Sequence, residues 1–497
     1  MNRHLYLLWI MAFTPGCAVG PDYKKPNVVV PKQWLESTST AKTAKRDYQS
    51  DQWWLTFNDS TLKQLMADAV AANLDFKIAL ERIKDARSQQ TAIFASGLPS
   101  LSARGSGNRR YNNTSSAASS GGTASGGGFG IGNQLINIFQ FGFDAQWELD
   151  FFGGVRRALE AADANIASEV ENSRAVLVTL LGDVARNYID LRTNQQLAEI
   201  TRNNLVAQRD TQALTEIRQQ SGLGTMLEVA QAQAQADTTE AQLPNYETLV
   251  KQSIHALGVL VGREPAALAA RLGQRAAISA VAATVIPDLP SELLQRRPDI
   301  RRAERQMAAA NAAVGIATAE LYPKINLSAF LGLQNSRITD FTPVGKSWST
   351  AATLTMPIFN WGKLNANIKS KKAQYQQTFL TYQATVLNAF KDVEDTLIAY
   401  RKEQERCKAL TNAVNANQLA VDLANERYEK GLTGFIDVLQ TQQTLYQSES
   451  LLVMSEGKVS SNLVALYKAL GGGWQTTSPV SDASLVPNGK EGQVVKK

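Results

Sequence analysis

Residues 139–154, FQFGFDAQWELDFFGG, alternate between apolar and polar side chains with a period of two. Aromatic side chains such as Phe141 and Trp147 fall on one set of positions, and acidic ones such as Asp144 and Glu148 fall on the other. A strand with this pattern has one aromatic face and one polar face. A half-buried strand of an ordinary sheet shows the same alternation, so this segment alone leaves its surroundings open.

Four strands of this kind are expected along the chain. They cover residues 100–111, 137–151, 325–336 and 347–358. Each is long enough to cross the hydrocarbon layer of an outer membrane when it is tilted. No apolar run after residue 16 approaches the ~18 to 20 residues of a transmembrane helix, so any membrane crossing would use strands.

Four strands cannot close into a barrel, and a bilayer tolerates no open sheet edge. Closure would therefore come from other copies of the chain. In that arrangement the aromatic face would meet lipid, and Asp144, Glu148 and Asp150 would line a water-filled lumen.

The other periodic segments predict long helices with a narrow apolar stripe. Val386, Val393, Tyr400 and Cys407 belong to a series that recurs every seven residues, which is a coiled-coil seam. Cys407 is therefore interpreted as a packing residue. The remaining positions are mostly polar, so such a helix can be wet on two sides. A helix over residues 155–220 would span roughly 100 Å at ~1.5 Å per residue, which suits the wall of a tube or a rod. Helices are expected over residues 60–97, 155–220, 226–262, 299–321, 363–430 and 435–470.

The two halves of the chain align as an internal repeat. Residues 217–233 match residues 426–442, and Gly222 corresponds to Gly431, an offset of 209 residues (431 − 222). Each copy contains a helix, a strand, a loop, a strand, a long helix, a turn and a helix. The first copy carries extra low-complexity residues at 112–132, which are interpreted as a flexible loop.

These patterns predict a mixed α and β fold, mostly α, with two internal structural repeats. The expected divisions are a signal peptide at 1–16, an anchor and N-terminal segment at 17–58, repeat 1 at 59–264, a linker at 265–298, repeat 2 at 299–473 and a disordered tail at 474–497.

The N-terminus has the form of an export signal, with a basic Arg3 and a short apolar run before Cys17. A cysteine at this place resembles the bacterial lipoprotein cleavage site, where the thiol is acylated and becomes the new N-terminus. Thr14 replaces the usual Leu, and an incidental cysteine beside a simple cleavage site is the alternative. Ala18 follows where an Asp would favour the inner membrane, so the resemblance implies the outer membrane. A covalent lipid on Cys17, such as palmitate, is the only cofactor expected.

Composition removes several classes of function. The chain has 497 residues and a formal charge of +6. The charges are spread along the whole length, which is typical of a solvated surface and not of a nucleic-acid partner. Two histidines and two cysteines leave little for a metal site, a disulfide scaffold or histidine catalysis. Glycine-rich stretches lack the lysine of a phosphate loop, so no enzyme activity is expected.

Five stretches together resemble the outer membrane factor family, of the TolC and OprM type, and its NodT-like lipoprotein branch. They are CAVGPDYKKP, DQWWLTFNDSTLKQLMADAVAANLDFKIALERIKDAR, WELDFFGGVRRA, LPSELLQRRPDIRRAERQMAAANAAVGIATAELYPKI and TMPIFNWGKL. The resemblance covers nearly the whole mature chain.

The resemblance implies a homotrimer in the outer membrane of a Gram-negative bacterium. Twelve strands would form one β-barrel, continuous with a periplasmic α-helical coiled-coil barrel. Such a channel docks through a periplasmic adaptor protein onto an inner-membrane pump, usually of the RND type. It passes small toxic compounds or drugs outward, as in multidrug resistance, and performs no chemistry of its own.

The resemblance also implies two turns that contact the adaptor. SGLGT and KGLTG match the periplasmic tips of the family. The tip residues are Gly222, Leu223, Gly224, Thr225, Gly431, Leu432, Thr433 and Gly434. Gly222 and Gly431 would also serve as helix C-caps whether or not a partner binds.

Asp437, in FIDVLQ, matches an aspartate that rings the closed periplasmic end of the tunnel in family members. Three such carboxylates repel one another and attract cations, which gives a gate sensitive to charge. The second acidic position of the family is Gln440 here. Glu228 holds the corresponding place in repeat 1. A carboxylate in the first turn of a helix is favoured in any case.

Two other functions remain open at this point. One is a type I secretion duct for proteins or peptides, although the lipoprotein start and the RRPDI block favour small-molecule efflux by resemblance. The other is a structural or adhesive trimeric coiled coil on the cell surface, against which the two-faced strands of both copies argue.

Overall fold

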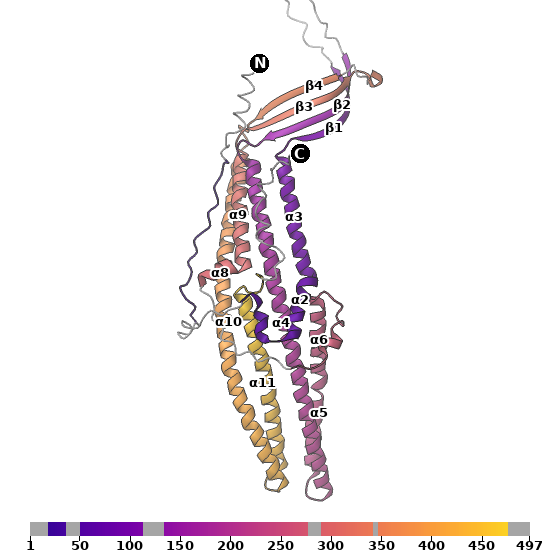
Figure 1. Ribbon diagram of the computed structural model, residues 1–497, viewed down its shortest axis with the longest axis vertical. Helices are drawn as coiled ribbons and strands as arrows, with labels where there is room; N and C mark the ends of the chain where they lie inside the picture. The colour runs from indigo at the N-terminus through magenta and orange to yellow at the C-terminus, as the bar shows by residue number, and fades with distance from the viewer. Residues whose placement is uncertain (1–17, 36–49, 113–133, 277–289, 341–345, 476–497) are drawn as a thin grey trace, which may run out of the picture. The chain divides into compact units, whose positions relative to one another are not determined.

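The computed structural model describes residues 18–35, 50–112, 134–276, 290–340 and 346–475, and these are mostly helical with one small sheet (Figure 1). They form two compact units. The first holds the described parts of residues 1–25, 85–166 and 306–379, and the second those of 26–84, 167–305 and 380–497. Cys17, the expected signal peptide, most of the low-complexity loop and most of the tail lie outside the described residues. No helix in the described ranges is both long and apolar enough to cross a bilayer.

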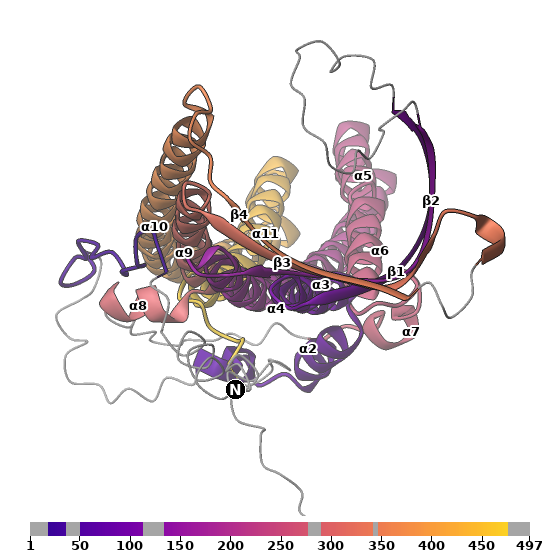
Figure 2. The same ribbon diagram turned by 90° about the horizontal axis from the view of Figure 1, so that it is seen from above.

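The first unit contains a four-stranded antiparallel sheet in the order β1-β2-β3-β4. The strands are β1 (Ser100–Asn112), β2 (Gln134–Leu149), β3 (Lys324–Asn335) and β4 (Lys346–Thr355). They lie side by side in chain order (Figure 1), and the view from above shows that the sheet is curved (Figure 2). All four predicted strands are confirmed, although β2 and β4 end two and three residues earlier than expected.

The pairing register gives the sheet two distinct faces, because residues directly opposite one another in antiparallel strands share a face. Phe143 of β2 lies opposite Leu331 of β3, which lies opposite Trp348 of β4. On the other face Asp144 lies opposite Ser102 of β1. The alternation read from β2 alone therefore extends across the whole sheet.

The helices follow the predicted order. They are α2 (Ser60–Ala72), α3 (Leu74–Ser96), α4 (Gly154–Gln220), α5 (Met226–Glu240), α6 (Leu243–Leu260), α7 (Ala269–Leu272), α8 (Pro290–Arg296), α9 (Pro298–Ala319), α10 (Lys363–Glu429) and α11 (Phe435–Ala469), with short 3₁₀ segments η2 (Ser50–Phe57) and η3 (Ile338–Asp340). Helices α4 and α10 each have 67 residues and begin 209 residues apart (363 − 154). This offset equals the 209 residues that separate Gly222 from Gly431.

Two helices expected to be continuous are broken. Asn73 divides the first, because its side-chain oxygen accepts the N–H of Phe76 at 2.9 Å and its amide donates to the carbonyl of Leu260 at 2.9 Å. The second divides between α5 and α6, where Pro244 occupies the first turn of α6. Proline has no N–H to donate and is tolerated best at such a start. The predicted linker also contains two short helices, α7 and α8.

Heptad positions contribute to the core of the second unit, together with apolar side chains of η2, α2 and α6. Val386 and Val393 are 0% exposed, as the seam pattern predicts. Cys407 is half-buried on the same series. Burial raises the pKa of the Cys407 thiol, with a further contribution from Glu456. The thiol therefore stays protonated and weakly nucleophilic, which agrees with its interpretation as a packing residue.

Replacing Leu257 by Ala should destabilise the second unit by about 2–5 kcal/mol, because Leu257 is 0% exposed within the main hydrophobic cluster and its loss leaves a cavity. Val259→Ala on the same helix is the matched control, since Val259 is 61% exposed and should change stability by less than about 0.5 kcal/mol. Thermal unfolding of the detergent-solubilised protein, followed by circular dichroism, measures both. Equal losses would contradict this assignment of the core.

Candidate functional sites of the sheet and the helix turns

Asp144 and Glu148 lie on the polar face of β2, as predicted. Asp144 is half-buried, and its position is paired with Ser102 on one side and Phe330 on the other. The Glu148 carboxylate is 3.5 Å from the Lys324 ammonium, and both side chains are about half exposed. An exposed ion pair of this kind contributes little to stability. The two carboxylates therefore give the face its polarity and are not needed to hold the sheet together.

Asp150 has a different role from the one expected. The strand ends at Leu149, and the Asp150 carboxylate accepts the backbone N–H groups of Val155 at 3.1 Å and Arg156 at 3.0 Å. It also accepts from the Arg156 guanidinium at 3.3 Å. A carboxylate in this place satisfies free donors at a helix N-terminus and complements its dipole. Asp150 therefore starts α4 and is not part of the acidic row on the strand.

The apolar face of the sheet is open in the single chain. Phe143 is 53% exposed, Leu331 64% and Trp348 73%. The large exposed side chains of this face are Leu101, Tyr111, Leu135, Phe141, Phe143, Trp147, Leu331, Trp348 and Leu354. An apolar patch that spans four strands marks a contact with membrane or with another protein.

Phe330 is an aromatic residue on the polar face that the sequence analysis missed. It is 8% exposed and lies against Gly142 and Gly332, which are paired directly across β2 and β3. A Cβ placed on Gly142 would lie 2.7 Å from the Phe330 ring, and one on Gly332 would lie 2.6 Å from it. The glycines thus let the ring lie flat along the backbone. Glycines at paired positions of neighbouring strands were the available signal.

Both predicted turns have the same backbone geometry, in the second unit. Gly222 has φ +74° and Gly431 has φ +71°, and a Cβ on either would meet nothing within 4 Å. The N–H of Leu223 donates to the Arg218 carbonyl at 2.8 Å, and that of Leu432 donates to the Arg427 carbonyl at 2.8 Å. These bonds form Schellman C-caps, in which glycine is favoured by its positive φ. The C-cap role of both glycines is therefore confirmed.

The two carboxylates that follow these turns differ in their burial and in their hydrogen bonds. Glu228 is half-buried and forms a capping box with Thr225, whose N–H donates to the Glu228 carboxylate at 3.1 Å. Asp437 is exposed and accepts only the Thr433 hydroxyl among the hydrogen bonds of its side chain within the described residues. Phe435 beside it is 2% exposed in a small apolar cluster. That anchor orients the first turn of α11 and leaves Asp437 facing solvent.

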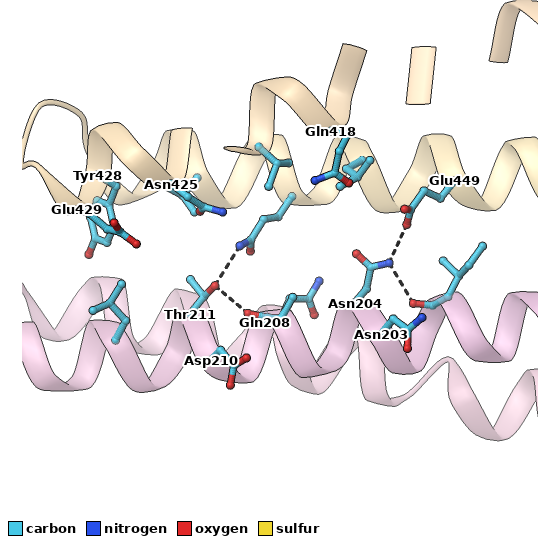
Figure 3. Close-up of a pocket in the computed structure, with 17 residues that line it drawn as sticks. Asn203, Asn204, Gln208, Asp210, Thr211, Gln418, Asn425, Tyr428, Glu429 and Glu449 are labelled. Atoms are coloured by element: carbon cyan, nitrogen blue, oxygen red, sulfur yellow. Dashed lines mark hydrogen bonds between the residues drawn. The ribbon is translucent and has the colours of Figure 1, made fainter. Parts of the chain in front are cut away.

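A polar cavity of about 500 Å³ lies between α4, α10 and α11 in the second unit (Figure 3). Asn204 donates to Glu449 at 2.9 Å, and Gln442 donates to Thr211 at 3.0 Å across it. Gln208 is 3% exposed, and its amide atoms have no hydrogen-bond partner among the described residues. A cavity of this size and polarity can hold water. Sequence analysis predicted wet helix faces but did not locate this cavity.

No cluster of three or more histidine, cysteine, aspartate or glutamate side chains in the described ranges is placed to hold a metal ion.

Comparison with known proteins agrees with this architecture. The family model described as outer membrane efflux protein matches residues 65–263 and 289–472. The chain is 31% identical over 469 residues to the solvent efflux pump outer membrane protein SrpC of Pseudomonas putida, covering 93% of this chain and 96% of that protein. It is 29% identical over 478 residues to nodulation protein T of Rhizobium leguminosarum bv. viciae, covering 95% and 94%.

Among solved structures, the outer-membrane channel OprN superimposes with a TM-score of 0.83 at 30% identity, over 92% of this chain and 100% of that one. The family match and the structural match thus each cover most of the chain. The chain belongs to the outer membrane efflux protein family and is an outer-membrane channel for efflux.

Proposed function

We propose that three copies of the chain close their sheets into one twelve-stranded barrel in the outer membrane, above a shared tunnel of helices. The observation that carries this proposal is the curved sheet with one exposed aromatic face and two edge strands, β1 and β4. An open edge cannot remain in lipid, and β4 of one copy can pair with β1 of the next. The polar face, with Asp144 and Glu148, then lines the exit lumen.

The exposed turns are the proposed contact with a periplasmic adaptor, which links the channel to an inner-membrane pump of the RND type. Leu223 is 70% exposed and Leu432 is 65% exposed, each at the apex of a rigid Schellman turn. Exposed apolar side chains on a fixed backbone are suited to a protein interface. The tips are Gly222 to Thr225 and Gly431 to Gly434.

The cargo we propose is small toxic compounds or drugs, passed outward without chemical change. SrpC is described as part of a solvent efflux pump, which supports a cargo of this class. The energy would come from the pump, so the channel needs no catalytic site. Secretion of peptides or proteins is the second candidate.

A lipid on Cys17 is the proposed anchor of each copy in the inner leaflet of the outer membrane. Two features of the sequence support this anchor, namely the short apolar run and the cysteine at its end. Intact mass of the mature protein would reveal the acyl chains.

Asp437 is the proposed gate residue at the periplasmic end, and its exposure supports this role. Three exposed carboxylates near a symmetry axis would repel one another and favour cations. Glu228 is a weaker candidate, because its carboxylate is used in the capping box.

Cysteine labelling in native outer membranes tests the barrel. In a Cys407→Ala background, cysteines at positions 144 and 148 should react with a membrane-impermeant maleimide, because they face water. Cysteines at 143 and 147 should not react, because lipid covers them. Equal labelling at all four positions would remove the barrel from the proposal.

Efflux itself is tested by the accumulation of a fluorescent lipophilic cation in a strain that lacks the gene. Deletion should raise accumulation several-fold, and the wild-type gene should reverse the rise, because the pump would lose its exit. Unchanged accumulation together with an altered set of secreted proteins would favour the secretion duct. Absence of conductance by the purified protein in a planar bilayer would favour a structural coiled coil.

Asp437→Ala should raise single-channel conductance and lower cation selectivity in planar bilayers, because it removes one negative charge from each copy at the gate. Glu228→Ala is the matched control at the corresponding position of repeat 1, where little change in either property is expected. If both properties stay at their wild-type values in Asp437→Ala, Asp437 is not part of the gate.

A further inference from the structure

The described residues that follow Cys17 are held in a built contact within the first unit. Residues 18–22 belong to CAVGPDYKKP. They contact part of WELDFFGGVRRA and the AAVGIATAEL part of the stretch that begins with LPSELLQRRPDI. These are three of the stretches that carry the family resemblance, yet neither the lumen nor the helix turns explain them. Their convergence calls for a separate function.

Arg157, in the first turns of α4, is the centre of this contact. Its side chain is only 6% exposed. Its Nε donates to the Val19 carbonyl at 3.1 Å, and its Nη2 donates to the Gly20 carbonyl at 3.3 Å and to the Asp22 carboxylate at 2.8 Å. Its Nη1 donates to Glu160 at 2.7 Å. Every nitrogen of the guanidinium is therefore used, which offsets the cost of burying its charge.

Two further hydrogen bonds fix the same segment. The N–H of Val19 donates to the Phe152 carbonyl at 3.1 Å. The side-chain amide of Asn311 on α9, 5% exposed, donates to the Pro21 carbonyl at 2.9 Å. The segment is thus held from both α4 and α9.

Glycines stand at the points where the backbones approach most closely. A Cβ on Gly20 would lie 2.5 Å from the Gly315 Cα, and a Cβ on Gly153 would lie 2.7 Å from the Ala18 Cα. Gly20 and Gly153 also have φ of +98° and +78°. A Cβ on Gly315 would lie 2.9 Å from Arg157 Cγ and Cδ. No larger residue fits any of these places without displacing the segment or the arginine.

We propose that Arg157 is the positioning residue for the lipid anchor: it holds residues 18–22 so that the acylated residue 17 enters the membrane beside the end of its own β2 strand. This proposal rests on the lipid anchor proposed above. The Val19 contact is with Phe152, three residues beyond the end of β2 at Leu149 (152 − 149). The acyl chains would then start where the apolar face of the sheet starts.

The clamp changes what the anchor can do mechanically. Without it, the lipid would be tied to Val28, the next side chain of the segment that packs against a hydrophobic cluster. The 11 intervening steps (28 − 17) could extend to roughly 36–40 Å, so the lipid could move away from the barrel. With the clamp, one residue, Ala18, separates the attachment point of the lipid from the held Val19.

Hydrogen exchange of the full-length protein in detergent tests the clamp. Arg157→Gln should speed exchange of the Val19 amide at least tenfold. Arg202→Gln is the matched control, because Arg202 lies on the same helix, α4, and its guanidinium donates to the Glu247 carboxylate at 2.9 Å, and it should leave Val19 protected. Gly315→Ala is a second variant, which suits a helix better than glycine yet crowds Arg157, and it should also speed the exchange. Wild-type protection of Val19 in Arg157→Gln would overturn the clamp.

A double-mutant cycle on efflux separates positioning from mere folding. Arg157→Gln should lower efflux of the fluorescent cation several-fold with Cys17 present, and should cause no further loss in a Cys17→Ser background. An equal loss in both backgrounds, or no loss in either, would overturn the positioning role. If intact mass shows no acyl chain on Cys17, the anchor and its positioning both fail, while the exchange result still decides whether Arg157 holds the segment.

Discussion

A four-stranded sheet with one aromatic face and two edge strands cannot pair all of its backbone groups or cover its apolar face by itself. Its edge strands carry backbone donors and acceptors that must pair, and its aromatic face has too large an apolar area to stay in water. In the proposed trimer both demands would be met, because β4 of one copy would pair with β1 of the next and lipid would cover Phe143, Leu331 and Trp348. On this proposal, the same constraint accounts for an incomplete sheet in each chain. A complete barrel within one chain would need no partner copies and would leave no reason for a shared lumen.

The helices must also bury apolar side chains while part of their surface faces water. Their seam residues, such as Val386 and Val393, are fully buried, while amides and carboxylates line the cavity beside Gln208 and Asn204 together with apolar side chains. A wall that faces water on one side can bury only a narrow stripe, so much of the stability must come from regular packing along its length. Polar contacts between helices, such as the hydrogen bond from Asn204 on α4 to Glu449 on α11, then specify which helices lie side by side. They do so without adding apolar surface to the wall.

Much of this architecture could be predicted because periodicity is a local property of the sequence. The four strands, both long helices and the two Schellman turns follow from alternation, heptads and glycine placement. The breaks at Asn73 and Pro244 could not be located, because each depends on a hydrogen bond or a turn that one residue supplies. Asp150 continues the strand alternation in sequence, yet the nearby helix start captures its carboxylate. The cavity at Gln208 depends on how three helices meet, which no single pattern records.

The contact of Phe330 with Gly142 and Gly332 has a consequence for the substitutions that this sheet can accept. The glycine backbones approach so closely that a Cβ on Gly142 would lie 2.5 Å from the Leu331 carbonyl oxygen. A methyl group on either glycine would push β2 away from β3, while loss of the ring would expose bare backbone on the polar face. The three residues therefore depend on one another, and a single substitution at any of them is disfavoured. Variation in the chemistry of the polar face is therefore expected at its other positions.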